Sequence, residues 1–446
     1  MFTFVQQVFD SSLSRGAVVT FGVRVVGAGL LFGLHILLAR WMGTGGYGAY
    51  AFAVSGASVA AQLGALGLPT AALRFVPTYL SDGRGGTLWA FLHRGRWITG
   101  GATTLLVALV FGIGFFLPLD PLSRQALLVG LWLAPLMALG SFETEVLRAH
   151  QQFLLSYVPS HILRPLGVGA GVGVLLWYTG DVLAVEVLLC MGGVLLCLIL
   201  LQQWGTRVRL PPPPAETGPR RTRYWLRVAF PLLLVGGFQL ILSKTDILLV
   251  GGLIGSEEAG IYFAAMRIAQ VVTFVGFAVD AVSAPVVSRL YGDDHEALQE
   301  TVSTLAHWYF WPSLGAALGL ALLAHPLLSL FGTGFTAGGP VLYVYLVGLL
   351  VNAAMGAQTF LLTLTGHERS CAHVFGWCAA LNLGLNLAGV LTLGALGAAL
   401  ATTLILAVRN LWIRQYVVHR TGIRPSIVAA LRTTSPFNAG SLPGFI

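Results

Sequence analysis

Long apolar stretches recur along almost the whole chain, and short polar gaps separate them. Charged residues make up 9% of the 446 residues, whereas a soluble domain usually carries about 25%. Because the bilayer core holds no water to bond with the backbone, apolar stretches of about 20 residues become membrane-spanning helices. The composition therefore argues against a soluble multidomain protein and predicts an all-α integral membrane protein.

About twelve spans can be placed on these stretches, at about 20 residues for each crossing. The expected spans are 14–40, 47–72, 97–119, 124–147, 153–178, 182–204, 226–250, 258–284, 299–324, 339–364, 370–392 and 396–418. Two connections, 73–96 and 285–298, are expected to be long, and a third, 205–225, is rich in proline and arginine. Prolines prevent a continuous helix there. We therefore expect an N-terminal lobe at 1–204, a linker at 205–225, a C-terminal lobe at 226–419 and a cytoplasmic tail at 420–446.

The distribution of arginine and lysine predicts the orientation. If the N-terminus is cytoplasmic, the inner segments carry eighteen arginines and the outer segments carry two, Arg40 and Arg124. Cytoplasmic loops are enriched in Lys and Arg, so both termini are expected inside. The tail contains a short amphipathic piece at 427–431, which we expect to lie on the inner membrane surface.

The two halves of the sequence resemble each other. A shift of 212 residues pairs Gly43 with Gly255, and it also pairs Gly48 with Gly260. Small residues at these positions allow helices to approach closely. Each half has an even number of expected spans, so the pattern indicates a parallel repeat whose axis lies along the membrane normal.

Three arginines fall deep inside the expected spans. At a rise of about 1.5 Å per residue, Arg24 and Arg164 lie roughly 15 Å from the inner ends of their spans, and Arg267 lies roughly 13 Å from the outer end. A charge at the centre of a span costs about 2.5–3.5 kcal/mol on insertion scales, so such residues usually face water or a partner. We expect these three to converge near the bilayer midplane, and we expect Arg24 and Arg267 to line a polar cavity.

Other charged residues within spans allow simpler interpretations beside a functional one. Lys244 and Asp246 can pair with neighbouring helices, or Lys244 can extend towards the outer interface. Asp280 can mark the inner interface, and Arg164 can bond the carbonyl groups that Pro165 leaves free. As functional residues, Lys244 and Arg164 would bind substrate with the other arginines. Asp246 and Asp280 would form charge pairs or take part in coupling.

Arginine remains charged, and its planar fork matches phosphate oxygens. A group of arginines at the midplane therefore suits an anionic headgroup, in particular a pyrophosphate. Proton-coupled export of organic cations would favour carboxylates in the N-terminal half, and the first three expected spans contain none. The sequence has no P-loop, GxSxG or HExxH motif, and its cysteines and histidines form no metal-ligand spacing. We expect no enzyme activity, no cofactor, no metal and no nucleic-acid partner.

Five segments carry a resemblance to a known family. They read SLSRGAVVTFGVRVVGAGLLFGLHILLARWMGTGGYGAYAFAV, GALGLPTAALRFVP, KTDILLVGGLIGSEEAGIYFAAMRIAQ, GFTAGGPVLYVYLVG and GALGAALATTL. With them the chain resembles the polysaccharide-biosynthesis flippases of the multidrug/oligosaccharidyl-lipid/polysaccharide exporter superfamily, up to about residue 420.

The resemblance implies two six-helix lobes in a V around a central cavity, in the bacterial inner membrane. It implies alternating access that moves glycans linked to undecaprenyl pyrophosphate to the outer leaflet, with glycosyltransferases or a polymerase of the same pathway as possible partners. Cavity arginines would hold the pyrophosphate; Arg24 and Arg267 match those positions in helix and depth, and Lys244 matches less closely. The alternatives are a multidrug or metabolite exporter of the same fold, a membrane glycosyltransferase or ligase, and a membrane scaffold that transports nothing.

Overall fold

The computed structural model describes residues 12–116, 118–212, 218, 221–290, 295–356, 358, 361 and 368–433. Every regular element in these residues is a helix. The predicted all-α class is therefore confirmed. Contacts between residues divide the chain into two compact units, which we name the first unit, Gly16–Ile261, and the second unit, Tyr262–Ile446 together with Met1–Arg15.

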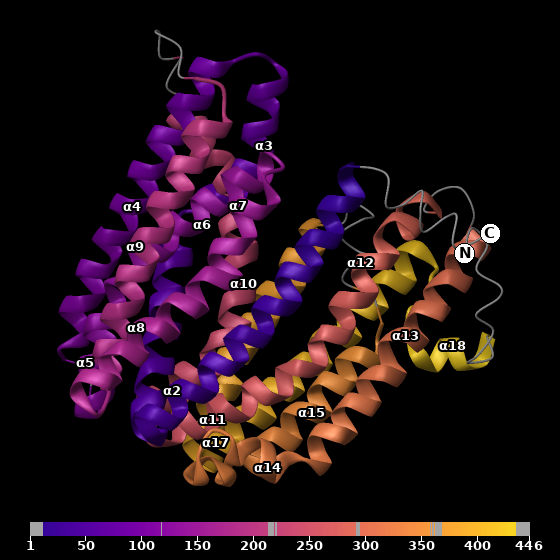
Figure 1. Cartoon of the computed structure of the whole chain (residues 1–446). Coiled ribbons are helices and arrows are strands. Elements are labelled where there is room, and N and C mark those ends of the chain that lie inside the picture. Colours follow the sequence, from indigo (N-terminus) through magenta and orange to yellow (C-terminus); the bar gives the residue numbers. More distant parts are fainter. Residues whose placement is uncertain are drawn as a thin grey trace. The chain divides into compact units, whose positions relative to one another are not determined.

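The first unit is a bundle of long helices, shown mainly in indigo to magenta in Figure 1. Its elements are α2 (Ser12–Gly64), α3 (Leu68–Ser81), α4 (Gly85–Gly114), α5 (Pro121–Leu131), α6 (Leu133–Ala149), α7 (Phe153–Val158), the π-helix η1 (Pro159–Leu163), α8 (Arg164–Thr179), α9 (Ala184–Arg209), α10 (Thr222–Leu253) and the start of α11 (Ser256–Ala269). Helix α6 packs against α3, α4 and α9, and thus forms the centre of this bundle.

The second unit continues α11 and contains the elements drawn in salmon to yellow in Figure 1. These are the 3-10 turn η2 (Gln270–Val272), α12 (Thr273–Leu290), α13 (His295–Leu322), α14 (Ala324–Ser329), the 3-10 helix η3 (Thr333–Gly338), α15 (Gly339–Ala354), α17 (Glu368–Thr421) and α18 (Ile427–Thr433). Helix α13 packs against both α12 and α15, and α15 packs against α17.

Eight helices in the described part of the chain are long and apolar enough to cross a membrane, or nine if α5 and α6, bent by 42°, form one span. Two of the eight, within α2 and α17, are pairs of helices joined across a glycine with positive φ, Gly43 (70°) and Gly394 (63°). Only glycine adopts such a backbone conformation without strain. The protein is therefore a multi-pass membrane protein, and the total of twelve spans stays a prediction.

Several helices extend further than their apolar segments. The connection expected at 73–96 is almost entirely helical, because α3 ends at Ser81 and α4 begins at Gly85. Likewise, α12 ends at Leu290 and α13 begins at His295, within the connection expected at 285–298. A helix satisfies its own backbone hydrogen bonds in water as well as in lipid. Hydropathy therefore marks the membrane-embedded part of a helix and not its ends.

Helix α10 packs against α3 within the first unit. The indole of Trp225 is 1% exposed, and its Nε1 donates a hydrogen bond to the hydroxyl of Tyr79 at 2.8 Å. At Gly67 the backbones are so close that a Cβ there would lie 2.2 Å from the carbonyl oxygen of Ala229. The first unit therefore continues past the segment at 205–225 to Ile261, and the division into lobes at that segment stays a prediction.

The short helix α18 packs on the second unit. Ile427 and Ala430 are buried against Ala306 of α13, while Val428 and Leu431 are 58% and 54% exposed. Apolar side chains thus lie both on the face that packs on the bundle and on an exposed face. The position of this piece on the inner membrane surface stays a prediction.

Candidate functional site

Arg24 of α2 lies over the ring of Tyr157 in α7. Its Cζ is 5.0 Å from the ring centroid, and its Nη2 donates a hydrogen bond to the tyrosine hydroxyl at 3.4 Å. A guanidinium within about 6 Å of an aromatic face gains a cation–π interaction. The side chain is exposed, so it remains accessible to a ligand while the tyrosine orients it.

A close backbone contact one turn further along α2 fixes this geometry. A Cβ at Gly27 would lie 2.6 Å from the Cβ of His161 and 2.7 Å from its carbonyl oxygen, so only glycine fits there. His161 belongs to the π-helix η1, which is closed by the backbone N–H of Arg164 donating to the carbonyl of Pro159. Such π-turns are rare and occur frequently at functional sites.

A cavity of about 200 Å³ opens beside this turn inside the first unit. Arg164 and Ser160 line it from the side of η1 and α8, and Glu145 and Gln202 line it from α6 and α9. The cavity thus brings together a guanidinium, a carboxylate and neutral polar groups. Arg164 thus lies on a cavity wall, and its role in binding substrate stays a prediction.

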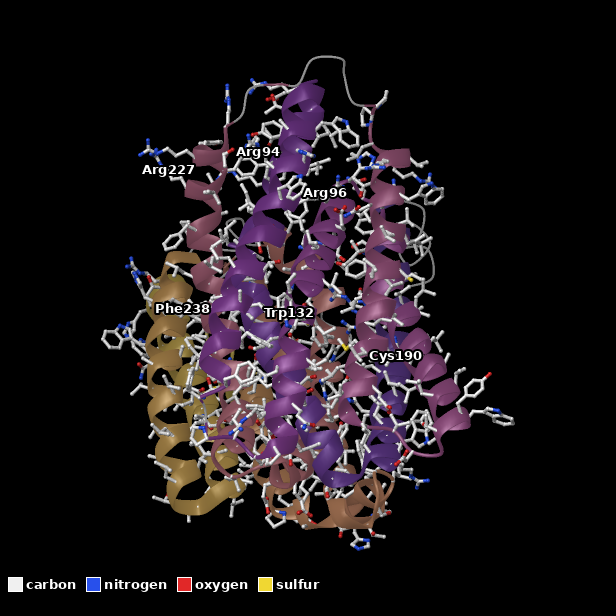
Figure 2. The ribbon with its side chains drawn as sticks, turned by 90° about the vertical axis from the view of Figure 1, so that its left-hand side faces the viewer. Arg94, Arg96, Trp132, Cys190, Arg227 and Phe238 are labelled. Atoms are coloured by element: carbon white, nitrogen blue, oxygen red, sulfur yellow. The ribbon has the colours of Figure 1, made fainter. Side chains whose placement is uncertain are left out.

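Glu145 forms an ion pair within its own helix, with Arg148 Nη2 3.0 Å from Glu145 Oε2. The same carboxylate also borders the cavity. Its neighbour Glu143 is fully buried and binds Arg96 at 2.5 and 3.0 Å. Figure 2 shows Arg96 towards the end of the bundle that also carries Arg94 and Arg227. We assign Glu143 a packing role, because its oxygens are bonded within the protein.

Lys244 and Asp246 lie in the second half of α10. Asp246 is 2% exposed, and its Oδ1 accepts a hydrogen bond from the backbone N–H of Ile247 at 2.8 Å. Lys244 is partly buried. Because α10 belongs to the first unit, both residues lie in the same unit as Arg24 and Arg164.

Arg267 lies in the second unit, at the end of α11. Its Cζ is 4.6 Å from the ring centroid of Phe263, and its Nη1 donates to Gln270 Oε1 at 3.2 Å. The arrangement parallels that of Arg24, since an aromatic ring again supports a guanidinium. The expected convergence of Arg24 and Arg267 joins residues of different units and stays a prediction.

Asp280 of α12 borders a second cavity, also of about 200 Å³. Its Oδ1 accepts a short hydrogen bond from the hydroxyl of Tyr309 in α13. The other polar residues that line this cavity are Thr273, Ser313, Asn352 and Gln358. Asp280 therefore faces the interior of the second unit, beyond the inner-interface role that the sequence also allowed.

A network of amide groups that the sequence did not reveal adjoins this cavity. Asn410 Nδ2 donates to Asn352 Oδ1 at 2.9 Å, and Gln358 Nε2 donates to Asn410 Oδ1 at 3.0 Å. Arg409 Nη2 lies 3.5 Å from the oxygens of both asparagines. Asparagines within an apolar run were the available signal, because a buried amide needs partners. Across the described ranges, no three His, Cys, Asp or Glu side chains are arranged to hold a metal ion.

Solved structures with a similar fold are transporters of one superfamily. A lipid II flippase, MurJ, in an inward closed conformation matches with a TM-score of 0.67 and 14% identity over 94% of each chain. An inward-facing multidrug resistance MATE transporter of the MOP superfamily matches with a TM-score of 0.71 and 13% identity, over 93% of this chain and 100% of that chain. A MOP superfamily transporter from Pyrococcus furiosus matches with a TM-score of 0.60 and 15% identity, over 94% and 96%. At these identities the likeness establishes the fold.

No curated protein sequence matches the chain significantly. Two family models match it. The model described as MatE covers residues 231–353. The model described as polysaccharide biosynthesis protein covers residues 13–291, which is more than half of the chain. The chain therefore belongs to the polysaccharide biosynthesis protein family and has the fold of the MOP superfamily transporters.

Proposed function

We propose that this protein is a flippase that moves an oligosaccharide linked to undecaprenyl pyrophosphate across the bacterial inner membrane, for surface polysaccharide synthesis. It acts as a secondary transporter by alternating access, with both termini in the cytoplasm, and not as an enzyme. Family membership supports the pathway, and the excess of arginines in the predicted inner segments supports the orientation.

The observation that carries this proposal is the arrangement of Arg24. Its guanidinium is held by Tyr157 yet exposed, and Arg164 directly follows the π-helix that contains His161. Two guanidinium groups near one π-turn suit the two phosphates of a pyrophosphate, since each can form a bidentate pair with phosphate oxygens. Arg267, held over Phe263, is the candidate contact from the second unit. We assign Lys244 an auxiliary role, because its ammonium is a point charge without the planar fork.

The experiment compares Arg24→Ala, Arg164→Ala and Arg267→Ala with the wild type. Purified protein in nanodiscs is titrated with undecaprenyl pyrophosphate, and binding is measured by the quenching of intrinsic tryptophan fluorescence. Each variant is expected to bind about tenfold or more weakly, because a charge-assisted hydrogen bond contributes about 1.5–3 kcal/mol. In cells, the same variants are expected to lose surface glycan.

Arg207→Ala is the matched control, because Arg207 is an exposed arginine in the last turn of α9. It should bind like the wild type. Wild-type affinity in all three test variants would reject the site assignment. Loss of sugar transfer to lipid, with normal flipping, would instead support a membrane glycosyltransferase or ligase.

A multidrug or metabolite exporter is the second candidate, and the MatE match over residues 231–353 favours it. Such an exporter should confer resistance to cationic dyes when over-produced, and its deletion should leave surface glycans unchanged. Because Arg24 and Arg267 are cationic, the flippase proposal predicts no gain in dye resistance.

A further inference from the structure

His161 of η1 lies close to both arginines of the candidate pyrophosphate site in the first unit. The charges of Arg24 and Arg164 both act on its ring. Tyr157, whose ring supports Arg24, also makes an edge contact with the ring of His161, with 5.7 Å between the two centroids. A titratable imidazole is therefore part of the same group of side chains as the two guanidinium groups.

Only one of the two ring nitrogens of His161 is used within the described part of the chain. Its Nδ1 lies 3.1 Å from the carbonyl oxygen of Tyr157 and 2.9 Å from the hydroxyl of Ser160. Because a carbonyl oxygen can only accept, Nδ1 carries a hydrogen and donates it. The side chain is half-buried, and its hydrogen bonds to described residues use Nδ1 alone. The ring is thus held in place, and Nε2 is left for a ligand.

The charges around His161 oppose a further positive charge while the site is empty. Two guanidinium groups act on the ring, and like charges repel. The carboxylate of this region, Glu145 on α6, interacts with Arg24 and Arg148. From α7, Tyr157 is a neutral acceptor for Arg24, and the residues of α9 that line the neighbouring cavity carry no charge. A protonated ring therefore needs an additional anion.

We propose that His161 is a third phosphate-binding group of this site and that it takes up a proton when pyrophosphate binds. The inference rests on the proposed function. The proton comes from water and binds the lone pair of Nε2, which then donates it in a hydrogen bond to a phosphate oxygen; no covalent bond to phosphorus forms. Imidazole has an ordinary pKa of about 6.5, so this uptake falls near physiological pH. Affinity for the pyrophosphate lipid should therefore rise as pH falls through this range.

The test uses His161→Gln, which keeps an amide near the position of Nε2 but cannot gain a proton. Purified protein in nanodiscs is titrated with undecaprenyl pyrophosphate at about pH 6 and at about pH 8.5, on either side of the ordinary imidazole pKa. The ratio of wild-type to variant affinity cancels the titration of the lipid itself. We expect this ratio to be about tenfold higher at the lower pH than at the higher pH.

His161→Asn separates the roles of the two ring nitrogens. Its amide can replace Nδ1 in the bond to Tyr157 but does not reach the position of Nε2, and it keeps the Cβ that meets Gly27. It should bind about tenfold more weakly than the wild type at about pH 6. His325→Gln, at an exposed histidine of α14, is the control and should behave like the wild type at both pH values. Thermal unfolding shows that each variant is folded.

A second measurement counts protons. Calorimetric titration near pH 7 in two buffers of different ionisation enthalpy gives the number of protons taken up for each bound lipid. The wild type should take up more protons than His161→Gln, by up to about one for each lipid. A merely structural role of His161 would change affinity without changing this count.

An affinity ratio that rises at low pH, together with the additional proton uptake, supports the role of His161. If the wild type binds the lipid but the ratio is constant with pH, or if the wild type and His161→Gln take up equal numbers of protons, the role of His161 is overturned and the proposed function stands. Wild-type affinity in His161→Asn at the lower pH also overturns it. If the wild type binds no pyrophosphate lipid at either pH, the proposed function fails, and this inference fails with it.

Discussion

Gly48 of α2 and Gly260 of α11 face each other across a contact between backbones. A Cβ at Gly48 would lie 1.7 Å from the carbonyl oxygen of Ser256, and a Cβ at Gly260 would lie 2.1 Å from that of Thr44. The shift of 212 residues that pairs the two glycines also pairs Thr44 with Ser256. The contact is therefore symmetric within the repeat. Each glycine approaches the carbonyl oxygen of the residue that lies four positions before the other glycine.

Substitution of either glycine should destabilise the protein. Gly48→Ala or Gly260→Ala inserts a methyl group where the backbones touch, and we expect a loss of about 1–3 kcal/mol. Because both variants separate the same two helices, the double variant should lose less than the sum of the two. Thermal unfolding in detergent measures both effects. Gly29→Ala is the control, since nothing lies within 4 Å of that position; equal midpoints for Gly48→Ala and this control would contradict the close contact.

Replacing only Glu143 of the buried ion pair with Arg96 should destabilise the protein strongly, whereas replacing both residues should destabilise it much less. Glu143→Leu leaves the guanidinium without its carboxylate and removes the acceptor of Thr206, which donates at 3.1 Å. We expect it to cost about 3–5 kcal/mol, and Arg96→Met with Glu143→Leu to recover most of that loss. Chemical unfolding monitored by tryptophan fluorescence tests this. A double variant as unstable as the single one would show that the pair itself stabilises the fold.

Tyr157 should act on ligand affinity through Arg24. Tyr157→Phe keeps the ring below the guanidinium and removes one long hydrogen bond, so we expect pyrophosphate-lipid affinity to change less than threefold. Tyr157→Leu removes the ring as well, and we expect affinity to fall about tenfold. Tyr178→Leu, at an 82% exposed tyrosine, should bind normally. Equal affinities for Tyr157→Leu and Tyr157→Phe would exclude an orienting role of the ring.

Gln299 should hold the segment before α18 in place. Its amide donates to the carbonyl oxygen of Arg424 at 3.2 Å and accepts from the N–H of Arg424 at 2.8 Å. Each bond contributes about 1 kcal/mol, so Gln299→Ala should increase the rate of amide hydrogen exchange at Arg424 about tenfold or more. Gln203→Ala on α9 is the control. An unchanged exchange rate in Gln299→Ala would mean that the packing of Ile427 and Ala430 suffices.

Features set by local chemistry could be predicted from the sequence. Gly43 and Gly255 were paired by the repeat, and both have positive φ, 70° and 138°. The helical class followed from the apolar stretches, because a bilayer leaves the backbone few alternatives.

Features that depend on packing between distant segments could not be predicted. The sequence did not indicate that Arg24 meets Tyr157, since 133 residues separate them. Nor did it show that the first unit extends to Ile261, because a proline-rich segment looks like a boundary whether or not the next helix packs back. The lining of both cavities requires the relative rotation of several helices, and the low charge content that identifies the membrane helices carries little information on rotation.

The anchoring of α10 by Trp225 has a practical consequence. This helix is attached to the preceding bundle by a buried indole, a hydrogen bond to Tyr79 and the close approach at Gly67, and not by the peptide chain alone. A gene split between codons 212 and 221 should therefore yield two polypeptides that associate in the membrane when they are produced together. Such a split protein would carry a purification tag or a fluorescent reporter on each new end.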